Sequence, residues 1–529
     1  MIQSQTQNPE YWGNKFVLSD SDIEQIYNHF LEVEKPQTAA DIAQVVIANR
    51  VTEERNKIAR QLAGRMVYQP KGSYAVGDKL VFPAMGYVHG VVTAVREGYN
   101  PQLGTFSVIT ADVDHKSLEF AAQLDIEHPL NGDAALTAAM DTVDLEELNQ
   151  LYGTAVTQKV AQSLANNKNF VRISDEWFIK ALMADVNIGH LHLSEAILEI
   201  SEGGPLTVNE ILPQLDMDPA LDKSVLAFSL NYGLMGDDRF DEVAPKGEIA
   251  WFLRRMEPEA VQKTPERLLY SPIPYDKALL TPQLLHLERE LDDEWSDLPP
   301  VPVEIQAQTA VFTLLYPHRW AGTMPLSTRT KPFFPVSNSP RQRVVFIDEQ
   351  TQEEIVGWVV QEHRYVYGLK EWYDSNGIPI GGFIHLKTGP EPGVIILGYD
   401  RRRAQREWVR LATAVDNRIK FDLMRRSVGC GFDDLMIVGT DVVTAIDALW
   451  RRAEAHQRST ASLAAEIFPE LAEANPQNTV HAKTMYSAIN MLRRIPPGPL
   501  FAELVRHPAF QPVGDHYWQF DQARWQKDN

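Results

Sequence analysis

The sequence predicts a mixed α+β protein built from several domains. Its 529 residues exceed the length of one ordinary domain, and three to five units are expected for a chain of this size. Helical patterns flank two strand-rich segments, one from Tyr74 to Val113 and one from Ala310 to Leu397. Apolar residues make up 44% of the chain, which is enough to form a sizeable core.

The N-terminal part changes from helical to strand periodicity at Tyr74. Residues 17–66 predict three helices, and Ser21-Asp22 is expected to cap the first. Strands are expected over Tyr74–Pro83, Tyr87–Glu97 and Thr105–Val113. Val76-Gly77-Asp78, followed by Leu80-Val81-Phe82 and Val91-Val92, resembles the small barrels of Tudor and KOW-type transcription-elongation modules. Such barrels bind RNA, DNA or protein, so the resemblance assigns no ligand.

Residues 190–259 predict three helices followed by a β-hairpin, the element order of a winged helix. The unit resembles the winged-helix (HARE-HTH-like) family seen in the delta subunit of bacterial RNA polymerase and in chromatin-associated proteins. Its third helix, between Leu221 and Asp238, offers Lys223 as its only cation suited to contacting bases, beside three aspartates. We therefore expect this unit to bind protein or to be structural.

The central segment predicts a closed or nearly closed β-barrel, because six close-spaced strand patterns have no helical crossovers between them. The expected strands are Ala310–Tyr316, Val344–Asp348, Ile355–Val360, Tyr365–Tyr367, Phe383–Leu386 and Val394–Leu397. A long loop from His318 to Arg343 carries basic and aromatic residues, which can pair with phosphates and stack on bases. The alternative is a solvated loop whose aromatic rings plug one end of the barrel.

Several short motifs in this segment resemble the plant-type DNA-binding pseudobarrel, which is shared with some restriction-enzyme recognition domains. They are Leu326-Ser327, Phe333-Phe334-Pro335, the Asp348 turn, Trp358-Val359-Val360, and Trp372 followed by Gly381-Gly382. In that family two arms from neighbouring loops enter the major groove. The resemblance implies arms at Arg319–Lys331 and Arg364–Tyr373 in this chain.

Residues 441–520 predict a second winged helix, with four helices and a wing at Phe510–Phe520. Its third helix, Thr479–Arg494, carries side chains that can donate to base edges and phosphates in a major groove. The alternative is a solvated helix face with cations near its C-terminus, where the helix dipole favours them.

The predicted fold class is therefore α+β multi-domain, with winged-helix units plus two small β-barrels. The expected segments are an N-terminal helical domain (1–70), a KOW/Tudor-like barrel (71–135), a helical connector with a winged helix (136–260), a Pro- and acid-rich linker (261–305), a pseudobarrel-like barrel (306–440) and a C-terminal winged helix (441–529).

Charge is unevenly distributed along the chain. The net charge of −21 counts against a nucleic-acid partner, but residues 301–460 hold 20 Lys+Arg and 18 Asp+Glu. The densest basic run, Arg401-Arg402-Arg403, fits either a phosphate-contacting edge or a strand edge charged against pairing. The candidate nucleic-acid-binding residues are Arg319, Arg329, Lys331, Arg341, Arg343, Arg401, Arg402, Arg403, Lys483, Thr484, Asn490, Arg493 and Arg494.

The sequence contains no motif for catalysis, cofactor binding or metal binding. It lacks GxxxxGK[ST], GxGxxG after a strand, HExxH, paired CxxC and GxSxG. A single cysteine, Cys430, excludes a disulfide within the chain and fits the reducing cytoplasm. Neither a signal peptide nor an 18-residue apolar run is present, so no membrane contact is expected.

We therefore expect a non-enzymatic, cytoplasmic bacterial protein that acts in transcription or in chromosome or nucleoid biology. Double-stranded DNA would bind the central barrel and the C-terminal winged helix, and a protein partner would bind the acidic N-terminal units. The first alternative is an interaction scaffold whose winged helices bind protein. The second is an unrecognised enzyme with dispersed catalytic residues, such as a nuclease.

Overall fold

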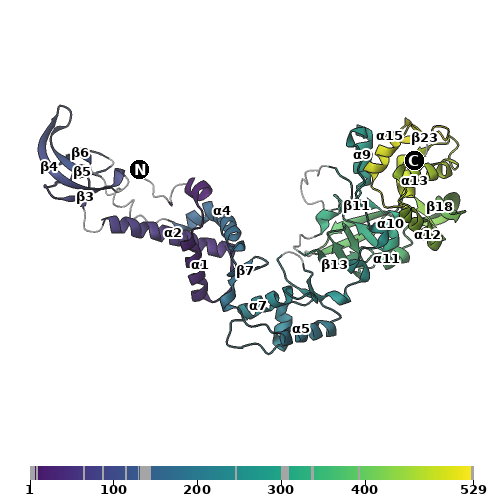
Figure 1. The fold of residues 1–529 in the computed structure, drawn as a ribbon, viewed down its shortest axis with the longest axis horizontal. Coiled ribbons are helices and arrows are strands. Elements are labelled where there is room, and N and C mark those ends of the chain that lie inside the picture. Colours follow the sequence, from purple (N-terminus) through teal and green to yellow (C-terminus); the bar gives the residue numbers. More distant parts are fainter. Residues whose placement is uncertain are drawn as a thin grey trace. The chain divides into compact units, whose positions relative to one another are not determined.

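The computed structural model describes residues 6, 10–62, 66–85, 88–113, 116–128, 130–131, 144–244, 247–298, 309–334, 339–390 and 393–525. It contains both helices and strands, which confirms the mixed α+β class (Figure 1). Contacts divide the chain into two units, residues 1–186 with 217–232, and residues 187–216 with 233–529. Tyr87, Pro335 and residues 299–305, which belong to expected strands, motifs or linkers, lie outside the described residues.

The N-terminal helical part of the first unit consists of helices that are distant in sequence. A short π-helix (Tyr11–Lys15) precedes α1 (Asp20–Val33) and α2 (Ala39–Leu62), and α4 (Leu145–Ala165) packs on α2. A small sheet of order β1-β8-β7 completes it, with β1 at Gln37–Thr38, β7 at Phe170–Ile173 and β8 at Glu176–Ile179.

Two expectations for this part, the number of helices and the cap of α1, were wrong. The second and third expected helices form the single helix α2, because no proline or glycine interrupts residues 39–62. The helical connector expected over residues 141–166 forms α4, which packs on α2. Ser19, rather than Ser21-Asp22, caps α1, and Asp22 closes the capping box from inside the helix.

A five-stranded sheet is inserted between α2 and α4. Its order is β2-β3-β4-β5-β6, with bounds Met66–Val67, Lys79–Phe82, Val88–Asn100, Gly104–Val113 and Lys116–Ala122. Backbone hydrogen bonds from Gln123 to Gly72 and from Leu124 to Pro70 join the two ends of the sheet, which is therefore curled. The expected strands are present in shortened or extended form, and β6 was not expected.

The second unit begins with α5 (Ile188–Ile200), α6 (Val208–Ile211) and the hairpin of β9 (Phe240–Glu242) and β10 (Trp251–Leu253). Helix α7 (Lys223–Met235) spans the boundary between the two units. The helices α8 (Glu259–Gln262) and α9 (Pro282–Leu291) follow. The helix–hairpin order agrees with the sequence pattern, and the winged-helix architecture itself stays a prediction.

The central segment forms a curled seven-stranded sheet, a half-barrel of order β11-β16-β17-β13-β14-β15-β12. Its strands are β11 (Thr309–Thr313), β12 (Thr323–Pro325), β13 (Arg341–Asp348), β14 (Glu354–Val360), β15 (Tyr365–Tyr367), β16 (Phe383–Thr388) and β17 (Val394–Tyr399). Its edge strands β11 and β12 do not pair with each other within the described residues, so the expected closed or nearly closed barrel is a half-barrel. Tyr316 begins α10 (Tyr316–Ala321), with Pro317 in its first turn, and α11 spans Lys370–Ser375.

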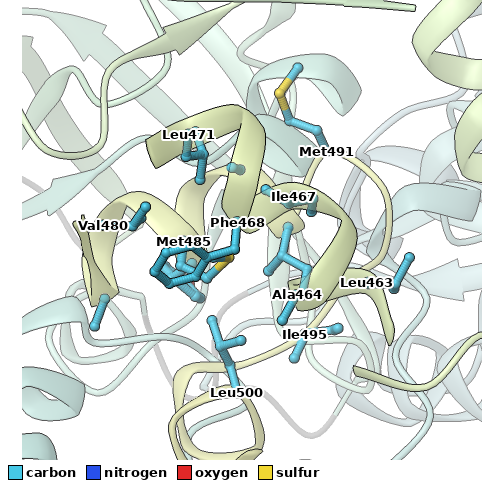
Figure 2. Packing of buried hydrophobic residues seen from close by; sticks show 14 of the residues in the cluster. Leu463, Ala464, Ile467, Phe468, Leu471, Val480, Met485, Met491, Ile495 and Leu500 are labelled. Atoms are coloured by element: carbon cyan, nitrogen blue, oxygen red, sulfur yellow. The ribbon is translucent and has the colours of Figure 1, made fainter. Parts of the chain in front are cut away.

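The C-terminal part packs helices against a long hairpin. After β18 (Arg401–Val415), β19 (Arg418–Cys430) and β20 (Val438–Gly439) come α12 (Val443–Ala455), α13 (Thr460–Ala472), α14 (Ala482–Ile489) and α15 (Pro497–Arg506). The strands β21 (Val480–His481), β22 (Phe510–Gly514) and β23 (Tyr517–Phe520) form the last sheet. Figure 2 shows the core of this part, where Leu463, Ile467, Phe468, Met485 and Leu500 meet.

Candidate nucleic-acid interface

The β18–β19 hairpin closes in a two-residue turn. Val415 pairs with Arg418, and the two residues between them, Asp416 and Asn417, have φ values of 50° and 61°. Positive φ at both central positions is the geometry of a two-residue hairpin turn whose twist matches the strands. In Figure 1 the hairpin, labelled β18, lies beside α12.

Each face of the hairpin is buried over only part of its length. Ala412, Ile419 and Phe421 belong to the C-terminal core, while Val409 and Leu411 on the opposite face pack near Ile437. Residues 401–406 and 422–427 are exposed. The anchored portion therefore holds an exposed two-stranded ribbon in place.

This ribbon is the strongest positive feature of an acidic chain. Residues 401–430, here called the basic hairpin, contain nine Lys+Arg and three Asp+Glu, a net charge of +6. The other residues hold 41 Lys+Arg and 68 Asp+Glu, a net charge of −27. Positive charge sufficient for a phosphate-binding surface is thus concentrated in one element.

Four cations of the basic hairpin have no protein partner within the described residues. Arg403, Arg406, Arg418 and Lys420 make no ion pair and no side-chain hydrogen bond there. Arg402 pairs with Asp400 at 2.7 Å and Arg426 pairs with Asp441, so these two are neutralised. Arg410 donates to the Asp434 carbonyl, and its burial lowers its pKa. Arg401 donates to the neutral amide of Gln350 and keeps its charge.

Trp408 lies among these cations. It pairs across the strands with Arg425, whose guanidinium lies 5.0 Å from the centre of the indole ring. Arg406 lies on the same face, because residues two apart on a strand point to the same side. An exposed indole with arginines beside it is a suitable surface for a planar, negatively charged ligand.

The predicted residues of the long central loop are dispersed, and most are bonded within the protein. Arg319 pairs with Asp374 at 2.7 Å, Arg329 donates to the carbonyls of Arg289 and Glu290, and Arg341 pairs with Asp241 and Glu257. Arg343 is half-buried on β13, where desolvation lowers its pKa. Lys331 is exposed and has no side-chain partner within the described residues.

The predicted third helix of the C-terminal unit faces the interior, contrary to our expectation. Thr484 donates to the Leu435 carbonyl at 2.7 Å, and the buried Asn490 donates to the carbonyls of Tyr486 and Ile495. Lys483 pairs with Glu290 and Asp433, and Arg493 donates to the Arg458 carbonyl. The apolar stripe that includes Met485 draws this short helix into the core (Figure 2).

Arg494 is the most deeply buried of the predicted cations. Its guanidinium is 1% exposed and lies 2.7 Å from both Asp293 and Glu294. Tyr486 donates to Asp293, and His318 lies 3.2 Å from Glu294. This buried charge cluster joins the end of α9, the half-barrel and the C-terminal helices, so Arg494 is structural and is not available to DNA in this structure.

Sequence reasoning identified Arg401, Arg402 and Arg403 and a candidate strand at Ile419–Met424, but it did not name the cations of that second strand, β19, as candidate binding residues. Arg418, Lys420, Arg425 and Arg426 follow a two-residue Asp-Asn turn between runs of β-branched residues. That turn signal would have placed these cations on the strand that pairs with β18, with Arg425 opposite Trp408.

A cavity of about 600 Å³ lies in the second unit. Its lining includes Tyr270, Tyr275, Glu288, Trp295, Lys331 and Arg364. Arg364 donates to the Glu294 carbonyl and lies over Trp295, and the nearby Asp297 pairs with Lys277.

The described residues contain neither a helix that could cross a membrane nor a group of three His, Cys, Asp or Glu residues placed to hold a metal ion. Cys430 is buried, and desolvation raises the pKa of its thiol to about 11, which suits a structural role. Comparison of the chain with protein-family models, with curated proteins and with solved structures gave no match in any of the three.

Proposed function

We propose that this protein is a non-enzymatic DNA-binding protein and that the basic hairpin is the element that contacts DNA. The observation that carries the proposal is a set of four cations, Arg403, Arg406, Arg418 and Lys420, that have no protein partner within the described residues and lie on a partly exposed two-stranded ribbon. Lysine and arginine bind the phosphate backbone largely by releasing its counterions, so such a ribbon favours nucleic acid over a neutral partner.

Duplex DNA is the proposed ligand, and transcription or chromosome biology is the proposed setting. The major groove admits a two-stranded β-ribbon as well as a helix. Resemblance to winged-helix units, to a KOW/Tudor-like barrel and to a DNA-binding pseudobarrel supports this setting. The DNA-contacting element that we propose is the basic hairpin, in place of the central loop and the third helix that the sequence predicted.

The alternative for the basic hairpin is an edge strand charged against pairing, because β19 lies at the edge of its sheet. Edge protection needs a few charges and no exposed indole. The hairpin has exposed cations on both strands and on both faces, with Trp408 among them. Binding a polyanion explains this distribution better.

The test is duplex binding measured by fluorescence anisotropy across a salt series. For the wild type we expect log K to fall linearly with log salt concentration, with a slope near −0.9 for each neutralised phosphate. The triple variant Arg403→Gln/Arg406→Gln/Lys420→Gln should bind more weakly, with a slope shallower by up to about 2.7.

Arg493→Gln is the matched control, since Arg493 lies outside the hairpin and is bonded within the protein. We expect it to bind DNA like the wild type. Absence of binding by the wild type at low salt, or equal effects of the triple variant and the control, would refute the proposal.

A second candidate function, a protein-interaction scaffold, is favoured by one observation in the first unit. The tip of the β4–β5 hairpin exposes Tyr99 by 73% and Leu103 by 43%. The unit holds 16 Lys+Arg and 26 Asp+Glu, a net charge of −10. The scaffold would be favoured if a pull-down with the wild type recovers a protein partner after nuclease treatment and the variant Tyr99→Ser/Leu103→Ser recovers none. The wild type should then show no affinity for DNA.

A further inference from the structure

Trp408 is the exception among the tryptophans of this chain. All eleven lie within the described residues, and the other ten are buried or half-buried. Trp408 keeps 56% of its side chain exposed, on the basic hairpin and outside the core. More than half of this large ring system remains in water and is therefore open to a stacking ligand.

The neighbours of Trp408 define what that ligand must offer. Arg425 lies opposite on β19 and holds the indole by a cation–π contact, while Arg406 follows on the same face. A flat group that stacks on the ring and carries negative charge on both sides would satisfy all of these side chains together.

We propose that Trp408 stacks on an unpaired base of the DNA, with Arg406 and Arg425 contacting the flanking phosphates. A nucleotide in a single strand presents a free face to an aromatic side chain, and stacking tolerates any sequence because every base has such a face. In a paired duplex the faces are covered by neighbouring base pairs, and exposing one costs unstacking energy.

The inference rests on the proposed DNA binding and adds a preference to it. The basic hairpin holds any DNA through phosphates, and it holds DNA with unpaired bases more tightly. The expected preferred ligands are single strands, gaps and tails. The preference depends on the indole, whereas binding to duplex DNA depends on the cations.

The experiment measures anisotropy with three labelled 20-mers: a single strand, the same strand with abasic sites in place of its bases, and the duplex. Trp408→Ala should weaken binding to the single strand by about 5- to 150-fold and leave binding to the abasic strand and the duplex within about twofold. Trp408→Phe keeps an aromatic ring and should lose less. Unchanged hydrogen exchange over β18 and β19 shows that the variants keep the hairpin.

Each other outcome counts against the inference. If Trp408→Ala weakens all three ligands equally, the indole supports the hairpin and does not stack. If the wild type binds the duplex with the expected salt slope but gains nothing from unpaired bases, this inference fails and the proposed DNA binding stands. If the wild type binds none of the ligands at low salt, both fail.

Discussion

Removing the Arg494 guanidinium should destabilise the C-terminal part far more than removing an exposed arginine. The cation lies between Asp293 and Glu294, which are 0% and 3% exposed, and it also donates to Asn490 at 3.1 Å. In Arg494→Met the side-chain volume is largely retained, while two carboxylates lose the charge that compensates them.

The size of the effect follows from the buried pair. Breaking a buried ion pair by deleting one partner costs about 3–5 kcal/mol, since the remaining charge stays in a poorly solvated site. Arg506→Met is the matched control in the same part of the chain, because Arg506 is 59% exposed and pairs with Glu503 on the helix surface. Such a surface pair contributes about 0–1 kcal/mol.

The assay is native-state hydrogen exchange over α14 and α15, since a chain with several domains has no single unfolding free energy. Arg494→Met should lose about 10²- to 10⁴-fold of protection there, and Arg506→Met less than about fivefold. Adding Asp293→Asn and Glu294→Gln to Arg494→Met should restore part of the loss, because no buried charge then remains. Equal protection in the two single variants would refute the reasoning.

Three further predictions concern pH, a glycine and the hairpin turn. Burial, with Asp241 beside it, raises the pKa of Glu257 from 4.5 to about 8. The folded state therefore holds a proton on Glu257 that the unfolded state releases, and the stability gained from this proton is complete below pH 4.5 and is lost as the pH rises to 8. We expect the thermal midpoint to fall less between pH 5 and pH 8 in Glu257→Gln than in the wild type. Gly368→Ala should cost about 3 kcal/mol or more in denaturant unfolding of the half-barrel, because φ is +122° and the new Cβ would lie 2.2 Å from the Val356 carbonyl oxygen. Gly377→Ala is the control and should cost about 1 kcal/mol, because its φ is +59° and no atom lies within 4 Å of the new Cβ. Asn417→Val should increase hydrogen exchange at the ends of β18 and β19, since a β-branched residue is strained by about 1–3 kcal/mol at φ 61°, while Asn417→Gly should not; equal exchange in the two variants would contradict the turn assignment.

The strands of the half-barrel could be predicted because each is a short β-branched or aromatic run bounded by turn residues. Val344–Asp348 and Val394–Leu397 were both located from that pattern. Their parallel pairing was not, since it depends on which segments meet across about fifty residues. Local patterns indicate elements, whereas pairing is decided by the whole chain.

The candidate site was predicted only in part for a related reason. We expected the candidate cations to be exposed. Arg403 is exposed, whereas Arg494 and Arg341 are largely buried. Arg494 is compensated by Asp293 and Glu294, some 200 positions earlier, and Arg341 by Asp241, 100 positions earlier. No local signal distinguishes a cation that meets such a distant carboxylate from one that remains in water.

The pairing of β1 with β8 sets an order for events during synthesis. Gln37 meets Trp177 only after some 140 further residues have left the ribosome, and these include the whole inserted five-stranded sheet. The sheet contains all of its own hydrogen-bonding partners, so it can form while α1 and α2 still lack α4 and the last two strands. The N-terminal helical part, whose first helices are synthesised before the inserted sheet, is therefore completed only after that sheet can form.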